Sequence, residues 1–183
     1  MSNVVTIKRG VNIDLVGECS PELGATHTIS TAAIKPSDFK GVRFKLAVKE
    51  GDEVKAGSPL LFNKDVEAMK FCSPVSGEVV SVIRGEKRRI LEVRVLADTK
   101  TKFEDFGAAD PHTLDREAVI SKMMASGVWP MLKQRPYNVL ANPEVTPKAI
   151  FVSGFDTAPL APDMGMILDG QEKEFQAGID ALA

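Results

Sequence analysis

Cysteine, histidine and aromatic residues are scarce in this chain, and each shortage excludes a class of site. The 183 residues include two cysteines and two histidines, and aromatic residues make up 6%. Cys19 and Cys72 are far apart and form no CxxC pair, so by themselves they cannot hold an iron–sulfur cluster or a structural zinc. His27 and His112 are equally isolated. We expect unpaired thiols and ordinary histidines.

Long apolar runs and a strong net charge are also missing. No run approaches the roughly 18 apolar residues of a membrane-spanning helix, and early charged residues argue against a signal peptide. The net charge of −2 excludes a broad nucleic-acid surface. Residues 1–100 carry 16 basic and 13 acidic side chains, whereas residues 101–183 carry 7 and 12. This shift predicts two domains, 1–100 and 101–183.

Two glycine-containing patterns dominate the first hundred residues. They are V-x-x-G-D-x-V-x-x-G-x-x-L over residues 48–60 and S-P-x-x-G-x-V over residues 73–79. Apolar residues alternate with polar ones from Val42, which predicts a half-buried strand that ends at a Gly51-Asp52 turn. Val48-x-x-Gly51-Asp52 recurs as Val82-x-x-Gly85-Glu86. The pattern resembles the barrel-sandwich hybrid of biotinyl and lipoyl domains, which is built from two similar halves.

Other segments give weaker strand signals. Alternation predicts a strand over Leu91–Val95 that closes the first domain, and Leu60–Phe62 predicts another. Val4–Lys8 and the β-branched run Thr26–Ile34 are also expected to be strands.

The sequence pattern of residues 101–183 predicts helices and a buried strand rather than half-buried strands. Apolar spacing predicts a helix over residues 114–124, with Thr113 as its N-cap and Gly127 as its stop. Residues 138–147 are expected to form a loop. The continuous apolar run Ala149–Val152 predicts a strand buried on both faces.

A loop and a helix over Gln171–Leu182 follow that expected strand, which is the opening of an α/β unit. The predicted fold class is therefore α+β: a β barrel-sandwich hybrid followed by the beginning of a Rossmann-like α/β domain. We expect the polypeptide to be the N-terminal part of something longer, because one buried strand cannot form a sheet. Asp156-Thr157 would follow the carboxyl end of that expected strand, where ligands of α/β proteins usually bind. A loop leading into a helix explains these two residues equally well.

The sharpest local match is Glu67-Ala68-Met69-Lys70-Phe71, which nearly copies the E-A-M-K-M motif around a biotin-carrying lysine. In a carrier, proline follows the lysine by eight positions, but Pro74 follows Lys70 by four. The strand that should return from the hairpin tip is therefore missing. We expect Lys70 to lie in a strand or at its edge, and modification at Lys70 stays as the alternative.

No catalytic constellation emerges, so no catalytic, cofactor-binding or metal-binding residue is predicted. There is no G-x-G-x-x-G, P-loop or HExxH, and no nucleophile has a nearby base signature. The basic turn Arg84–Arg89 is suited to a membrane surface or an acidic partner, although a solvated hairpin tip is the simpler interpretation.

Several stretches, in order along nearly the whole chain, resemble the A subunit of the bacterial sodium-translocating NADH:quinone oxidoreductase. These stretches are Val5–Gly10, Val48–Lys55, Lys70–Val79, Arg84–Arg88, Leu114–Glu117, Ser126–Trp129, Arg135-Pro136, Lys148–Val152 and Asp156–Ala161. That family is similar to the electron-transport protein RnfC and, more distantly, to the flavin-binding subunit of complex I.

The resemblance implies a peripheral subunit on the cytoplasmic side of the inner membrane, which docks on partner subunits, chiefly the membrane-embedded B subunit. The flavin-binding relatives have a glycine-rich loop where this chain has Ala125–Pro130, and one glycine does not give the close backbone approach that a flavin phosphate needs. We therefore expect no flavin, iron–sulfur cluster or direct NADH site in this chain. Flavins and iron centres are expected in partner subunits. Ubiquinone is a possible substrate, at residues that the sequence does not identify.

Two functions from different classes result. The first is a cofactor-free component of a sodium-pumping NADH:ubiquinone oxidoreductase, with a role in assembly or quinone binding and no catalysis of its own. The second is a biotin or lipoyl carrier modified at Lys70.

Overall fold

A computed structural model describes residues 6, 9–10, 16–17, 20, 22–156, 158 and 160–183. Its elements, in chain order, are β1 Thr31–Ile34, η1 Pro36–Asp38, β2 Phe44–Leu46, β3 Glu53–Val54, β4 Pro59–Asn63, β5 Lys70–Cys72, β6 Gly77–Arg84, η2 Glu86–Arg88, β7 Ile90–Ala97, η3 Pro111–Thr113, α1 Arg116–Ala125, η4 Trp129–Met131, β8 Lys133–Gln134, β9 Val139–Leu140, α2 Met164–Leu168 and α3 Glu172–Leu182.

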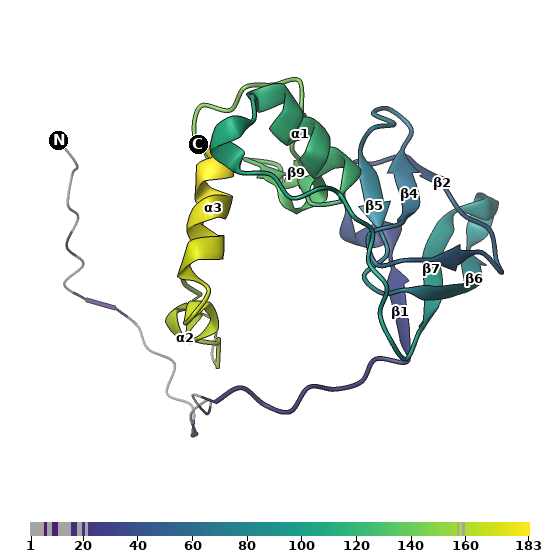
Figure 1. Cartoon of the computed structure of the whole chain (residues 1–183), viewed down its shortest axis with the longest axis horizontal. Helices are drawn as coiled ribbons and strands as arrows, with labels where there is room; N and C mark the ends of the chain where they lie inside the picture. The colour runs from purple at the N-terminus through teal and green to yellow at the C-terminus, as the bar shows by residue number, and fades with distance from the viewer. Residues whose placement is uncertain are drawn as a thin grey trace.

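Two antiparallel sheets form the first half of the chain. One has the strand order β1-β7-β6-β3, and the other has the order β2-β4-β5. Figure 1 shows both sheets together on the right of the view, with α2 and α3 well to their left. The predicted strands 42–49, 60–62 and 91–95 are confirmed by β2, β4 and β7. Of the predicted strand Thr26–Ile34, only the β1 portion forms, and most of Val4–Lys8 lies outside the described residues.

One apolar cluster fills the space between the two sheets. Leu60, Leu61 and Phe71 come from the three-stranded sheet, and Val79, Val93 and Val95 come from the other; all six are at most 1% exposed. Phe71 contacts the rings of Phe39 and Phe44 edge-on, each at 4.8 Å between centroids.

The two copies of the internal repeat lie against each other. Gly51 adopts φ +88°, as the turn requires, and its amide donates to the Val79 carbonyl of β6. The Glu50 carboxylate accepts a hydrogen bond of 2.7 Å from the Val82 amide, which opens the second copy. In the second copy Gly85 has φ −102°, so the two turns differ in conformation.

The helix predicted over 114–124 forms as α1, but its cap differs from the prediction. The Asp115 carboxylate accepts from the Ala118 amide at 2.7 Å, so Asp115 rather than Thr113 is the N-cap. Thr113 instead ends the short η3 turn and donates to the Asp110 carbonyl. Gly127, at φ +78°, follows the helix end as predicted.

The prediction of a buried strand at Ala149–Val152 is wrong for this chain. These residues form no strand and are exposed, with Phe151 at 92%. A strand buried on both faces needs a paired neighbour on each side, and none of the described residues pairs with this run. The expected loop 138–147 contains β9, which pairs with β8. The helix predicted over Gln171–Leu182 is confirmed by α3.

The fold class is confirmed in outline: a β sandwich comes first and a mixed helical region follows it. Within the described part of the chain, no helix has both the length and the apolar character to cross a membrane.

Candidate functional site

Lys70 is held against the surface rather than presented on a tip. It is the first residue of β5 and lies opposite Phe62 of β4. Its Nζ donates to the Glu67 carbonyl at 2.6 Å and lies 5.0 Å from the centre of the Phe62 ring. The prediction that this lysine lies in a strand is confirmed. Its amine is engaged by the loop before it, which is unlike a free swinging arm.

The S-P-x-x-G-x-V pattern has a structural role. Ser76 is 1% exposed, and its hydroxyl donates to Asp98 at 3.0 Å and accepts from the Lys102 amide at 2.8 Å. Gly77 has φ +147°, and a Cβ there would come within 1.8 Å of the Leu96 carbonyl oxygen. This motif therefore joins the start of β6 to the end of β7 and to the segment beyond it.

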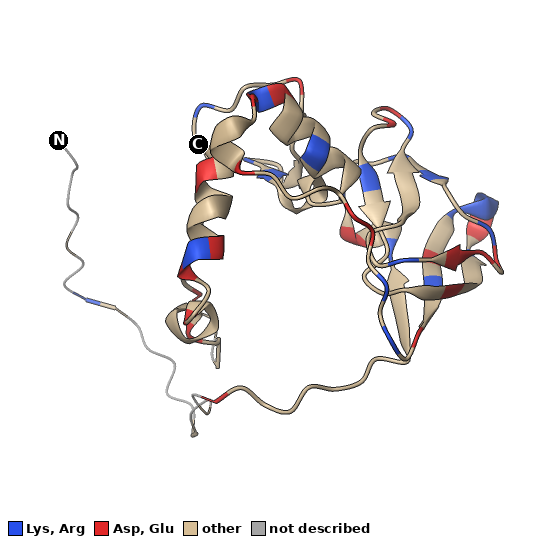
Figure 2. Ribbon diagram, viewed as in Figure 1, with Lys and Arg blue, Asp and Glu red and all other residues tan. Residues whose placement is uncertain are grey.

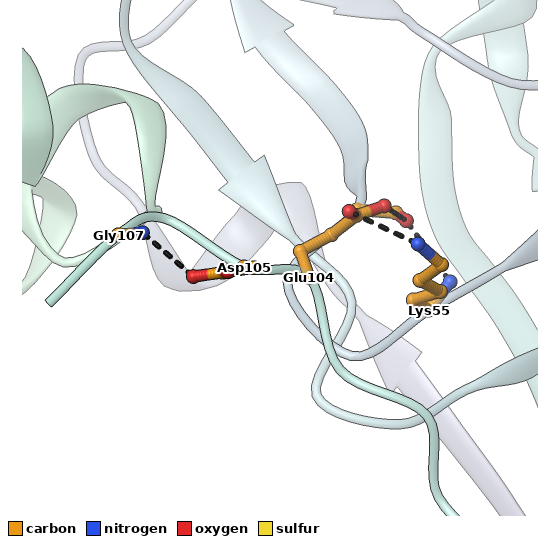
Figure 3. A network of polar contacts seen from close by, with 5 residues as sticks. Lys55, Glu104, Asp105 and Gly107 are labelled. Carbon is orange, nitrogen blue, oxygen red and sulfur yellow. Dashed lines mark hydrogen bonds and ion pairs between the residues drawn. The ribbon is translucent and has the colours of Figure 1, made fainter.

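The segment after β7 is bonded to the sandwich through Glu104, which lies beside Lys55 in Figure 3. Ala56 donates to the Lys102 carbonyl at 2.9 Å, and Glu104 donates to the Ala56 carbonyl at 2.8 Å. The Glu104 carboxylate accepts from the Ser58 hydroxyl at 2.9 Å and pairs with Lys55 at 3.5 Å. We call residues 102–107 the strap.

The other end of the strap is tied to the helix. The Nζ of Lys122, on α1, donates to the Phe106 carbonyl at 2.6 Å. Asp105 accepts from the Gly107 amide at 2.8 Å, which shapes the turn between the two attachments. The strap thus joins the barrel and α1 through hydrogen bonds that the sequence pattern did not reveal.

The loop after α1, where the resemblance places a glycine-rich loop in flavin-binding proteins, packs against β5. A Cβ on Gly127 would lie 2.9 Å from the Cys72 Sγ, and that sulfur lies 3.6 Å from the Ala125 carbonyl oxygen. Trp129 is 7% exposed, and its Nε1 donates to the Ala141 carbonyl at 2.8 Å. Burial raises the pKa of the Cys72 thiol to about 11, so the reactive thiolate form is scarce even in mildly alkaline solution.

The remaining sequence candidates do not come together. His27 is exposed, and His112 pairs with Asp180 of α3 at 3.3 Å. Asp156 is exposed and accepts from the Ala158 amide; Thr157 and Cys19 lie outside the described residues. Among the described side chains, no group of three or more His, Cys, Asp or Glu is placed to hold a metal ion.

The strand order, the two facing sheets and the glycine turns define the first domain as a barrel-sandwich hybrid, the class that includes biotinyl and lipoyl domains. Two family models match the chain: the NqrA N-terminal barrel-sandwich hybrid domain over residues 5–98, and the NqrA second alpha/beta domain over residues 114–183. The chain therefore belongs to the NqrA family.

Known relatives agree with this assignment. The chain is 36% identical over 182 residues to a Vibrio vulnificus protein named as the A subunit of the Na(+)-translocating NADH-quinone reductase. It is 34% identical over 185 residues to the protein of that name from Serratia proteamaculans, and 31% identical over 183 residues to that from Alcanivorax borkumensis. Each alignment covers 98% of this chain and 41% of the relative. The family resemblance drawn from the sequence is confirmed, and the alternative of a biotin or lipoyl carrier is overturned.

Proposed function

We propose that this chain forms the N-terminal part of the peripheral A subunit in a sodium-translocating NADH:quinone oxidoreductase. The observation that carries the proposal is the family match along both regions, together with the name that its relatives share. The hydrogen bond from the Lys70 amine to its own loop argues against a carrier role, and docking is the role that we propose in its place. In this proposal the chain contributes contacts for assembly rather than chemistry.

The proposal places the chain on the cytoplasmic side of the bacterial inner membrane, against the other subunits of the complex and chiefly the membrane-embedded B subunit. Flavins and iron centres belong to those partners, and this chain holds no cofactor of its own. NADH oxidation, ubiquinone reduction and sodium transport are activities of the assembled complex. Quinone contacts made by this chain are part of the proposal, at residues not yet identified.

The domain division is also a proposal, with residues 1–100 as the barrel-sandwich hybrid and 101–183 as the helical linker and incomplete α/β domain. The end of β7 at Ala97 supports a boundary at this point. The strap begins just after this boundary, and its hydrogen bonds to Ala56 of the first part and to Lys122 of the second hold the two parts together.

Assembly is tested by co-purification. The affinity-tagged chain is expressed with the remaining subunits, the membranes are solubilised in detergent, and the bound subunits are identified by mass spectrometry. We expect membrane subunits to be recovered with the chain. A Lys70→Arg variant, which keeps the charge but removes the amine that carriers use, should recover them equally. Failure of the unaltered, folded chain to recover any membrane subunit would contradict the proposal.

The quinone part is tested separately, by titrating this chain and a full-length relative with a short-chain ubiquinone while following tryptophan fluorescence, which in this chain comes from Trp129. A saturable change in both proteins would place quinone contacts within residues 1–183. A change in the longer protein alone would place them elsewhere.

A further inference from the structure

The basic turn that the sequence singled out forms one wall of a groove. Arg84, Lys87, Arg88 and Arg89 line it from the β6–β7 hairpin, and all four are exposed. This turn is the blue patch at the far end of that hairpin in Figure 2. Lys87 and Arg88 adopt left-handed φ values of 52° and 61°, which non-glycine residues rarely do. Non-glycine residues held in this region of backbone conformation cluster at functional sites.

A second wall, from the segment 36–46 and from Lys64, faces that turn. It adds three exposed cations, Lys40, Lys45 and Lys64. Among the described residues, seven basic side chains and no acidic one line a hollow of about 760 Å³. The rings of Phe39 and Phe44, with Ile90, supply half-buried apolar surface in the groove. Like charges gathered around a hollow focus a positive potential there, which attracts a ligand of opposite charge.

Two basic residues near the groove are neutralised by carboxylates of the chain itself. Arg43 lies in the same segment but forms a bidentate pair with Asp65, and this pair lowers the pKa of Asp65 chiefly through its hydrogen bonds. Lys35 pairs with Glu92. By contrast, none of the seven groove cations forms an ion pair with any carboxylate in the described part of the chain.

We infer that this groove binds an acidic polypeptide segment of a partner protein, with its carboxylates against the two basic walls and an apolar side chain over Phe39 and Phe44. The inference deepens the proposed docking role and rests on it. A bilayer presents its phosphates in a plane and would meet only the outermost of these side chains. A polypeptide enters a hollow and places charges on both sides, so charge complementarity and concavity together favour a peptide.

The test is fluorescence anisotropy with a labelled twelve-residue peptide of alternating glutamate and leucine, against the whole chain. The control peptide has glutamine in place of glutamate. The groove variant combines Arg84→Gln, Lys87→Gln, Arg88→Gln and Arg89→Gln. The matched control variant removes the same number of charges elsewhere on the surface, by Lys100→Gln, Arg116→Gln, Lys148→Gln and Lys173→Gln. Circular dichroism establishes that both variants are folded.

We expect the glutamate peptide to bind, and its Kd to rise about tenfold or more in the groove variant because four exposed charge contacts are lost. The control variant should change Kd by less than about threefold, and binding should weaken as sodium chloride is raised. Equal losses of peptide affinity in both variants would show that binding depends only on net charge, and would overturn the inference. No binding by the unaltered chain would overturn it as well.

Vesicles of phosphatidylglycerol and phosphatidylethanolamine form the second arm. If the vesicles bind through the groove residues while the peptide does not, the surface faces lipid and the inference fails. Co-purification of the groove variant separates this question from the proposed function. Full recovery of membrane subunits by the groove variant would contradict binding of a partner at the groove, while leaving the docking role intact. Failure of the unaltered chain to recover them would contradict the docking role itself.

Discussion

Replacing Phe71 with alanine tests whether the two sheets form one sandwich. Phe71 is 1% exposed and contacts two other rings edge-on, each at 4.8 Å. Loss of its buried area costs about 2–3 kcal/mol, and loss of two aromatic contacts costs about 0.5–1 kcal/mol each. The expected decrease in the free energy of unfolding is therefore about 4 kcal/mol, which lies within the range for Phe→Ala in protein cores.

Urea denaturation followed by Trp129 fluorescence is the measurement. The chain has one tryptophan, and this residue belongs to the same apolar cluster as Phe71, so its signal reports on the core that the substitution disturbs. With an m-value of about 2 kcal/mol/M, the midpoint should fall by about 2 M. Phe71→Leu, which leaves a smaller cavity, should lose about 1.5 kcal/mol and remains measurable if the alanine variant does not fold.

Phe151→Ala is the matched control, because the same atoms are removed from a side chain that is 92% exposed. We expect a change within about 0.5 kcal/mol. Equal losses for Phe71→Ala and Phe151→Ala, or a loss below about 1 kcal/mol at Phe71, would refute the shared core.

Three further predictions concern the backbone and the thiol. Gly77→Ala should cost about 3 kcal/mol or more in thermal denaturation because its Cβ would meet the Leu96 carbonyl oxygen at 1.8 Å, whereas Gly178→Ala, in an open position of α3, should stabilise by up to about 1 kcal/mol. Asp115→Ala should cost about 1 kcal/mol through loss of the α1 cap, and Asp115→Asn should restore most of it, as read from urea midpoints. In a Cys19→Ser background, iodoacetamide at pH 8.5 should alkylate Cys72 much more slowly in the native chain than in urea, because burial raises the pKa of the thiol to about 11. Since that pKa is raised on folding, the stability that this thiol contributes is present below its unfolded pKa of about 8.5 and is lost as the pH rises toward 11.

The sequence predicted the parts of the fold that depend on neighbouring residues. Alternation identified β2 and β7 because each of these strands has one face toward the core. The short apolar run Leu60–Phe62 identified β4, in which the adjacent Leu60 and Leu61 are both buried. Apolar spacing identified α3 for the corresponding reason in a helix. The N-cap of α1 was misplaced by two residues because Thr113 and Asp115 are both good capping residues, and the η3 turn, rather than local preference, decides between them.

Spacing within a motif proved more informative than the motif itself. Glu67-Ala68-Met69-Lys70 matches a carrier sequence almost completely, yet the four-residue interval between Lys70 and Pro74 excluded a full returning strand. The structure has a three-residue β5 that begins at Lys70. Counting residues between fixed turns therefore measures strand length directly, because each strand residue advances the chain by about 3.3 Å.

Tertiary contacts account for what the sequence could not predict. The apolar run 149–152 has the pattern of a buried strand whatever lies around it, but a strand forms only where neighbours satisfy its backbone groups, and the described residues supply none. The strap has the opposite character: its sequence is ordinary, and its role comes from the Ala56 and Lys122 partners, which are distant along the chain.

Ion pairs formed across the fold decide which basic residues remain unpaired in the groove. The segment 36–46 contains Lys40, Arg43 and Lys45, and by sequence these three cations are equivalent. The fold removes Arg43 from the set by placing Asp65 beside it, and it brings the other two opposite the β6–β7 turn. The excess positive charge is thus concentrated where the surface is concave and half-buried aromatic rings are available. This combination is what a partner segment with carboxylates and an apolar side chain would recognise, and it explains why the basic turn taken alone was best interpreted as a solvated tip.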